Sequence, residues 1–170
     1  MSYPIIKEIA DEEELIKSVD IIRKSFATVA NDFGLTEENC PTNPAFIKVE
    51  KLREQKHNNI LMFGLYDNDS QIGFVAIEKA DDDTYYMEKL SVLPEYRCKG
   101  YGKKLMEFVF AYVGNKKGKK VTIGIINENI NLKNWYKKCG FTETGTKKFA
   151  HLPFTVCFLE KQITAIETKK

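Results

Sequence analysis

A basic, glycine-rich turn, Arg97–Gly102, contains the residue types that could hold a phosphate group. It follows a strand-like run that stops at Pro94, and a helical pattern begins directly after it. Backbone N–H groups at the start of a helix point outward, and the helix dipole favours negative charge there. Gly100 and Gly102 let the backbone approach an anion with no Cβ in the way. The turn therefore predicts an anion-binding site.

Three glycine-rich motifs could give this kind of site. A P-loop needs G-x-x-x-x-G-K-[ST], and no stretch of this chain supplies it. A dinucleotide-binding fingerprint needs a third glycine, but Leu105 stands at that position, and the turn lies too late in the chain for a full dinucleotide fold. The third pattern, R/Q-x-x-G-x-G/A, is met by Arg97–Gly102.

Hydrophobic periodicity and turn residues predict the elements that position this turn. In order they are a strand at 5–9, helices at 12–31 and 46–56, strands at 60–66, 71–78 and 84–92, a helix at 100–113, a strand at 121–126, a helix ending at 138, and strands at 142–149 and 154–161. Asp11 with Glu14 fits a capping box, Asn129 or Asn131 can cap the helix that ends at 138, and Gly140 fits its C-terminal end.

The order of these elements predicts the fold class. Three successive strands joined by polar turns form an antiparallel meander, whereas the strand–helix–strand unit at 84–126 requires a parallel pair with a right-handed crossover. We therefore predict an α/β (α+β) fold with a mixed, mostly antiparallel sheet of about six to seven strands flanked by helices. The length of 170 residues fits a single domain over 1–170.

Composition excludes several classes of protein. A net charge of +2 is too small for a dedicated nucleic-acid binder. No apolar run approaches the roughly 20 residues that a membrane span needs, and charge precedes any apolar stretch at the N-terminus, unlike a signal peptide. Four dispersed cysteines and two histidines form no metal-ligand cluster. We expect a cytoplasmic protein that binds no nucleic acid, membrane or metal.

With this turn and the run that follows it at Asn129, the chain resembles the GNAT superfamily of N-acetyltransferases. The resemblance covers the whole element order and is sharpest from Tyr85 to Phe141, which includes the run N-x-N-L-K-N-W-Y-K-K-C-G-F from Asn129. It implies the fold of that family, acetyl-CoA (coenzyme A) as donor and an amine as acceptor. Asn129 matches an asparagine that contacts the pantetheine arm, and Tyr136 matches a tyrosine beside the coenzyme sulfur. Leu132 departs from the alanine of many members.

The predicted cofactor-binding residues combine the turn with these matched positions. Cys98 is included as the unspecified position within the turn, and the segment before Pro94 is included for its backbone N–H groups. The full set is Leu90, Ser91, Val92, Arg97, Cys98, Lys99, Gly100, Tyr101, Gly102, Lys103, Asn129 and Tyr136.

Acetyl transfer to an amine needs a neutral amine, a donor for the developing oxyanion and a leaving thiolate. Glu88 is the leading candidate base, since partial burial in its strand would raise its pKa, although a salt bridge would give it a structural role. His151, in the connection between the last two strands, and an ordered water are the other candidates. Tyr136 is the best proton source for the thiolate, with a packed core tyrosine as the alternative.

The resemblance also implies that a bulge aims backbone N–H groups of Leu90–Val92 at the thioester. The reaction it implies is direct attack in a ternary complex, with a small-molecule amine as acceptor. Acidic loops at Thr36–Cys40 and Asp81–Asp83 could attract a cationic amine. A protein N-terminus or lysine as acceptor, and a non-catalytic CoA-binding regulatory module, remain alternatives, as do a monomer and a homodimer.

Overall fold

The computed structural model describes residues 3–164 of the chain. Its elements are β1 (Ile5–Glu8), α1 (Glu12–Asp32), η1 (Pro44–Phe46), α2 (Val49–His57), β2 (Leu61–Asp67), β3 (Ser70–Lys79), β4 (Thr84–Val92), η2 (Pro94–Tyr96), α3 (Tyr101–Asn115), β5 (Lys120–Ile126), α4 (Ile130–Lys138), β6 (Thr142–Lys148) and β7 (Thr155–Gln162). The predicted order is confirmed. The predicted helix at 46–56 is shorter, because Ile47 and Lys48 have extended backbone that separates η1 from α2.

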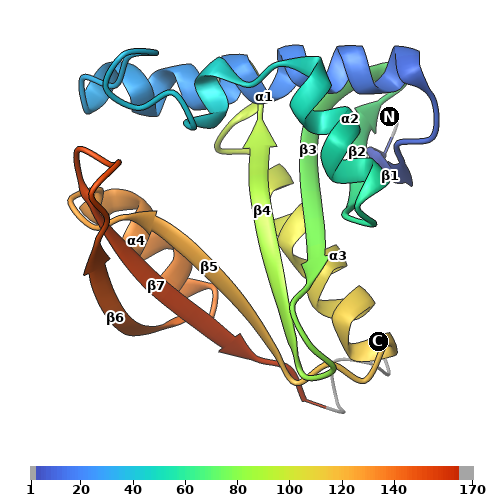
Figure 1. Cartoon of the computed structure of the whole chain (residues 1–170). Helices are drawn as coiled ribbons and strands as arrows, with labels where there is room; N and C mark the ends of the chain where they lie inside the picture. The colour runs from blue at the N-terminus through green and yellow to red at the C-terminus, as the bar shows by residue number, and fades with distance from the viewer. Residues whose placement is uncertain (1–2, 165–170) are drawn as a thin grey trace. The chain divides into compact units, whose positions relative to one another are not determined.

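The strands form one seven-stranded sheet in the order β1-β2-β3-β4-β5-β7-β6 (Figure 1). β1 pairs with β2, β2 with β3, β5 with β7, and β6 with β7, all antiparallel. The pair of β4 with β5 is parallel, with Thr84 opposite Lys120. This confirms the predicted mixed, mostly antiparallel sheet with a single strand–helix–strand crossover.

The chain divides into two compact units, and β4 contributes to both of them. The first unit holds residues up to Glu78 together with Glu88–Met106, and the second holds Lys79–Met87 together with the chain from Glu107 onward. The single domain over 1–170 stays a prediction, and residues 1–2 and 165–170 of it lie outside the described residues.

The core of the first unit lies under α1. The helix starts with the predicted capping box, in which the Asp11 carboxylate accepts the Glu14 N–H at 2.9 Å and the Glu14 carboxylate accepts the Asp11 N–H at 3.3 Å. Its apolar stripe, including the fully buried Ile22, packs with side chains of α2, β2 and β3 and with Ile47, which follows η1. The cluster consists of Ile9, Leu15, Ile21, Ile22, Ile47, Leu52, Ile60, Met62, Tyr66, Phe74, Ala76 and Leu93.

The second unit has its own aromatic core beside α4. Phe141 contacts the ring of Phe110 at a centroid distance of 5.9 Å and the ring of Tyr136 at 5.4 Å. Val121 of β5 and Leu159 of β7 have no exposed surface, so the paired strands close this core. Asn129 caps α4, and Gly140, with a φ of 100°, follows its last turn, as predicted.

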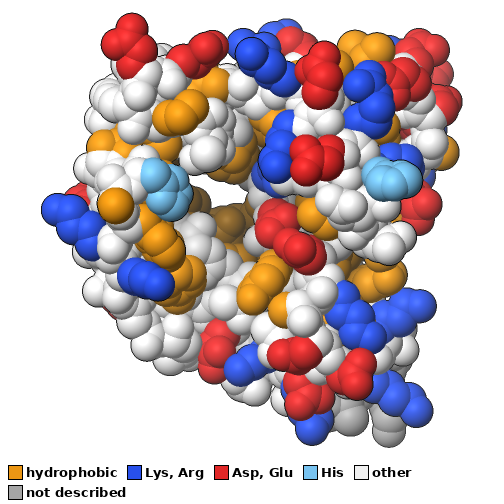
Figure 2. All heavy atoms as spheres, in the orientation of Figure 1, with side chains coloured by type: hydrophobic (Ala, Val, Ile, Leu, Met, Phe, Trp, Pro, Cys, Tyr) orange, Lys and Arg blue, Asp and Glu red, His pale blue; other side chains and the backbone are white. Residues whose placement is uncertain are grey.

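Acidic and basic side chains are interspersed over the face drawn in Figure 2. This mixture agrees with the net charge of +2. Within residues 3–164, no helix has the length and apolar character that crossing a membrane requires.

Candidate active site

The glycine-rich turn has the backbone geometry of an anion site. Cys98 and Gly100 both have left-handed backbone, with φ of 62° and 84°, and the Lys104 N–H donates to the Gly100 carbonyl at 3.0 Å. Gly100 therefore caps α3, and the helix begins at Tyr101. Successive N–H groups in such a turn form a concave nest, and the first N–H groups of a helix have no intrahelical acceptor. The turn is thus present, and α3 begins at Tyr101, one residue later than predicted.

The side chains around the turn are exposed and basic. Cys98 and Lys99 are exposed, and the Lys99 ammonium lies 5.5 Å from the centroid of the Tyr96 ring. The Tyr96 and Tyr101 rings lie 6.4 Å apart, so the two tyrosines flank the turn. Lys103, in the first turn of α3, is also exposed. These cations suit a polyanion that approaches from solvent.

The Arg97 side chain contacts α1 and the end of β4. Its guanidinium donates to the Ser25 carbonyl at 2.7 Å, to the Thr28 hydroxyl at 3.2 Å and to the Val92 carbonyl at 3.3 Å. A guanidinium carries five N–H donors. The predicted role of this side chain at the pyrophosphate stays a prediction.

β4 has an irregular backbone in the segment where a bulge was predicted. Lys89, with a φ of 54°, is the residue of β4 with left-handed backbone. The Ala80 and Asp81 N–H groups both donate to the Thr84 carbonyl, at 2.9 and 3.2 Å, and the Leu93 N–H donates to the Ile72 carbonyl at 2.9 Å. Counted from Ala80, β4 has one residue more than β3 between these hydrogen bonds, whereas counted from Asp81 the two strands have equal numbers, so the bulge itself stays a prediction.

The N–H groups of Leu90–Val92, which were predicted to be aimed at the thioester, differ in their hydrogen bonding. The Val92 N–H donates to the hydroxyl of Ser25 at 3.2 Å, so the expectation that it is unpaired is wrong. The Ser91 hydroxyl donates to the Lys89 carbonyl at 2.8 Å and so stabilises the left-handed backbone at Lys89 from within the strand. A role for the N–H groups of Leu90 and Ser91 at the oxyanion stays a prediction.

Glu88 lies beside a second carboxylate and a buried lysine. Its side chain is 29% exposed, and that of Lys89, whose ammonium lies 3.9 Å from the Glu88 carboxylate, is 12% exposed. Burial, followed by a hydrogen bond with Glu78, raises the pKa of Glu88 to about 7, while the charge of Lys89 acts in the opposite direction. Burial also lowers the pKa of Lys89. Glu88 thus has the pKa of a general base near neutral pH.

Replacement of Lys89 tests the electrostatics of Glu88. Lys89→Asn removes the positive charge that lowers the pKa of Glu88, and asparagine tolerates the left-handed backbone at this position. We expect the acidic limb of kcat/KM against pH to move to higher pH, with a loss of several-fold at pH 7. Lys17→Gln, on an exposed lysine of α1, is the control and leaves the limb in place. An unmoved limb in Lys89→Asn would show that Glu88 does not set the profile.

Asn129, the N-cap of α4, and Tyr136, within the helix, have the spacing to share one face with Lys133, a buried lysine that was not among the predicted site residues. The Asn129 side-chain oxygen accepts the Leu132 N–H at 3.3 Å and so caps the helix. Lys133 is 9% exposed, and its ammonium donates to the Asn127 side-chain oxygen at 2.6 Å and lies 3.6 Å from the Glu143 carboxylate. Its spacing of four residues from Asn129 and three from Tyr136 was the signal for a shared face.

Tyr136 is 7% exposed and packs edge-to-face on the rings of Trp135 and Phe141. Burial raises the pKa of its phenol. A phenol of raised pKa remains protonated at neutral pH, so it is better suited to donate a hydrogen bond than to release its proton. His151, the second candidate base, is exposed in the connection between β6 and β7, where its ring lies 5.8 Å from the ring of Phe149.

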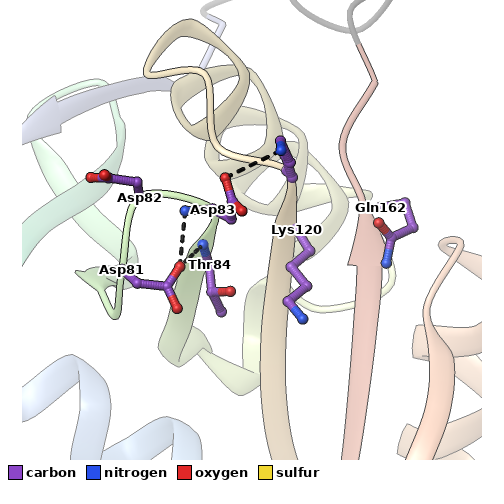
Figure 3. Close-up of a pocket in the computed structure, with 7 residues that line it drawn as sticks. Asp81, Asp82, Asp83, Thr84, Lys120 and Gln162 are labelled. Atoms are coloured by element: carbon purple, nitrogen blue, oxygen red, sulfur yellow. Dashed lines mark hydrogen bonds and ion pairs between the residues drawn. The ribbon is translucent and has the colours of Figure 1, made fainter.

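The acidic loop Asp81–Asp83 lines a recess of the second unit (Figure 3), and its charges are used within the protein. The Asp81 carboxylate accepts the N–H groups of Asp83 and Thr84 at 2.9 and 2.7 Å. Asp83 lies 3.6 Å from the Lys119 ammonium. The lining residues are Asp81, Asp82, Asp83, Thr84, Lys119, Lys120 and Gln162, and none of them belongs to the predicted site.

Comparison with known proteins identifies the family. Residues 28–141 match the model of the Acetyltransferase (GNAT) family, so the chain belongs to this family. It is 30% identical over 78 residues to an uncharacterized N-acetyltransferase of Mycobacterium tuberculosis. That match covers 46% of this chain, and it spans about half (50%) of the length of this curated relative.

Two solved structures share the fold of the chain. One is the ribosomal-protein-S18-alanine N-acetyltransferase from Escherichia coli, with a TM-score of 0.72, 14% identity and coverage of 95% of both chains. The other is the PaiA N-acetyltransferase from Thermoplasma acidophilum in complex with coenzyme A, with a TM-score of 0.71, 19% identity, and coverage of 94% of this chain and 99% of that one.

Proposed function

We propose that this chain is an acetyl-CoA-dependent N-acetyltransferase that moves an acetyl group to a primary amine of a small molecule by direct attack in a ternary complex. The observation that carries the proposal is the turn at Cys98–Gly102, whose left-handed residues and helix start turn backbone N–H groups outward together. Membership of the GNAT family supports it, as does the coenzyme A bound by the Thermoplasma protein of the same fold.

The turn fits the pyrophosphate of coenzyme A in backbone geometry and in charge. The N–H groups of Tyr101 and Gly102 would donate to its oxygens, and Lys99 and Lys103 would offset its charge. Asn129 would contact the pantetheine arm, in accordance with the resemblance. When bound, acetyl-CoA supplies the acetyl group as a thioester.

Three groups of the chain would then carry the reaction. Glu88 would take the proton that the attacking amine loses, and its hydrogen bond with Glu78 would hold that proton afterwards. The N–H groups at Leu90 and Ser91 would donate to the carbonyl oxygen as it gains negative charge. Tyr136 would donate a hydrogen bond to the leaving sulfur.

Tyr136→Phe tests the role proposed for the phenol. Because the ring and its packing are retained, we expect CoA affinity to stay within about twofold and kcat to fall by on the order of 10²-fold. Tyr66→Phe, which removes the hydroxyl of another buried tyrosine, is the matched control and should leave kcat unchanged. A rate for Tyr136→Phe equal to that of the wild type would remove Tyr136 from the mechanism.

The acceptor proposed is a small amine that is cationic in solution. The adjacent carboxyl groups of Glu78 and Glu88 support this choice, since they favour an ammonium group over a neutral nucleophile such as an alcohol. An acceptor on a protein N-terminus is the second candidate, because the E. coli protein of the same fold is named for an alanine of ribosomal protein S18. Thiol release measured over matched panels of small amines and short peptides distinguishes the two.

A further inference from the structure

Arg97 connects three segments of the first unit. Its Nε donates to the carbonyl of Val92 at the end of β4, at 3.3 Å. Its two Nη groups donate to α1, one to the Thr28 hydroxyl at 3.2 Å and the other to the Ser25 carbonyl at 2.7 Å. A planar guanidinium can satisfy these acceptors together, whereas the single ammonium of a lysine cannot reproduce the fork.

Ser25 completes this arrangement from the side of the helix. Its side chain is buried, its hydroxyl accepts the Val92 N–H at 3.2 Å, and the Arg97 Nη2 lies 3.4 Å from the same hydroxyl. Ser25 of α1 therefore binds the N–H of Val92, and Arg97 of the turn binds its carbonyl.

We propose that Arg97 is a positioning residue, which joins α1 to the end of β4 and thereby holds Leu90–Val92 in place, rather than a ligand of the pyrophosphate. The proposal rests on the proposed function, because the segment it positions is the one assigned to the acyl group. Loss of the guanidinium lets the end of β4 shift against α1. Misplacement of a reacting segment by about 1 Å lowers turnover by on the order of 10²-fold.

Two acyl donors separate the two roles of Arg97. Acetyl-CoA carries the pyrophosphate, and S-acetylpantetheine lacks it while presenting the same thioester. We expect Arg97→Gln to lower kcat/KM for both donors by a similar factor, on the order of 10- to 100-fold and mainly through kcat. Lys99→Gln is the comparison variant for a residue at the phosphate, and it should lower kcat/KM more for acetyl-CoA than for S-acetylpantetheine. Arg97→Lys should not restore the rate, because the charge returns without the fork.

A paired substitution and a stability measurement complete the test. Ser25→Ala should reproduce part of the loss with both donors, and the double variant should be less impaired than the product of the single effects, since both act on Val92. A loss in Arg97→Gln confined to acetyl-CoA would overturn the proposal in favour of a phosphate ligand. A lowered Tm with unchanged kcat for both donors would overturn it in favour of a stabilising role alone.

Failure of the proposed function would be recognised separately. If the wild type binds CoA but no amine accelerates thiol release, the enzyme assignment fails. In that case, CoA titrations at low and high salt still test whether the Arg97 side chain contacts the pyrophosphate. Replacement of a residue that is not a phosphate ligand leaves the salt dependence of CoA affinity unchanged, and we expect this result for Arg97→Gln. Lys99→Gln should instead reduce the salt dependence. A reduced salt dependence in Arg97→Gln would contradict the proposal.

Discussion

Glu88→Gln is expected to lower kcat by on the order of 10²–10⁴-fold, the usual contribution of a general base. Glutamine has almost the same shape but cannot accept the proton of the amine. Glu88 lies upstream of the turn, so the affinity for CoA should remain within about twofold of the wild type. A twofold change is small, since a tenfold change in affinity corresponds to about 1.4 kcal/mol. Steady-state kinetics and CoA titration measure the two quantities separately.

The same variant should gain stability above neutral pH. The pKa of Glu88 is 4.5 without the influence of the fold and about 7 within it. Below pH 4.5 the carboxyl is protonated in the folded and the unfolded protein, so its ionisation does not lower the free energy of unfolding. Above pH 7 the folded protein must hold an ionised, largely buried carboxylate, which does lower it. The resulting gain in the free energy of unfolding is no more than about 3 kcal/mol. Solvent screening of the partly exposed carboxylate reduces this gain, and so does the loss of the negative partner of Lys89 in the variant. Glu88→Gln should therefore unfold at a higher temperature than the wild type at pH 8 and lose this advantage at pH 4.

An exposed acidic residue supplies the control for both measurements. Asp69→Asn, in the turn between β2 and β3, should change neither kcat nor the pH dependence of unfolding. If Glu88→Gln retains the turnover of the wild type, an ordered water or His151 takes the proton instead. If its activity falls together with its stability at pH 8, the loss reflects damage to the fold.

Gly102→Val is expected to abolish CoA binding, with a loss on the order of 100-fold in affinity, or about 3 kcal/mol. Gly102 is the second residue of α3, where a branched side chain would occupy the space through which the pyrophosphate approaches the backbone. Valine is no worse a helix former than glycine, so α3 should form normally. Isothermal titration with CoA, together with a thermal melt, measures both effects.

Gly102→Ala is the graded control for this position. The pattern R/Q-x-x-G-x-G/A allows alanine there, so this variant should retain most of the affinity. Binding of CoA by Gly102→Val at the strength of the wild type would remove the turn from the cofactor site.

Local sequence chemistry predicted the elements and the turn well. A capping residue, a two-residue alternation or a glycine at a helix start acts on neighbours a few positions away, and the sequence displays such neighbours directly. The caps at Asp11 and Asn129, the hairpin of β2 and β3 and the start of α3 one residue after Gly100 are of this kind. An irregular backbone in β4 was predicted only through the resemblance, because Lys89 is an ordinary residue in an unusual backbone conformation.

Contacts between distant residues were not predictable in the same way. Arg97 matched a phosphate-binding pattern, yet its partners Ser25 and Thr28 lie about 70 positions earlier in the chain, on α1. The hydrogen bond of Glu78 to Glu88 likewise depends on which side chains of β3 and β4 share a face. Such contacts follow from strand register and helix docking, which a single sequence does not specify.

The most direct test of the central claim is release of free CoA from acetyl-CoA over a panel of primary amines, followed by thiol detection. Acetylated product is identified by mass spectrometry in the same reactions. We expect at least one small amine to accelerate thiol release and to appear as its N-acetyl derivative, and Glu88→Gln to abolish both signals. Tight binding of acetyl-CoA without acceleration by any amine or peptide would contradict the assignment of this chain as an N-acetyltransferase.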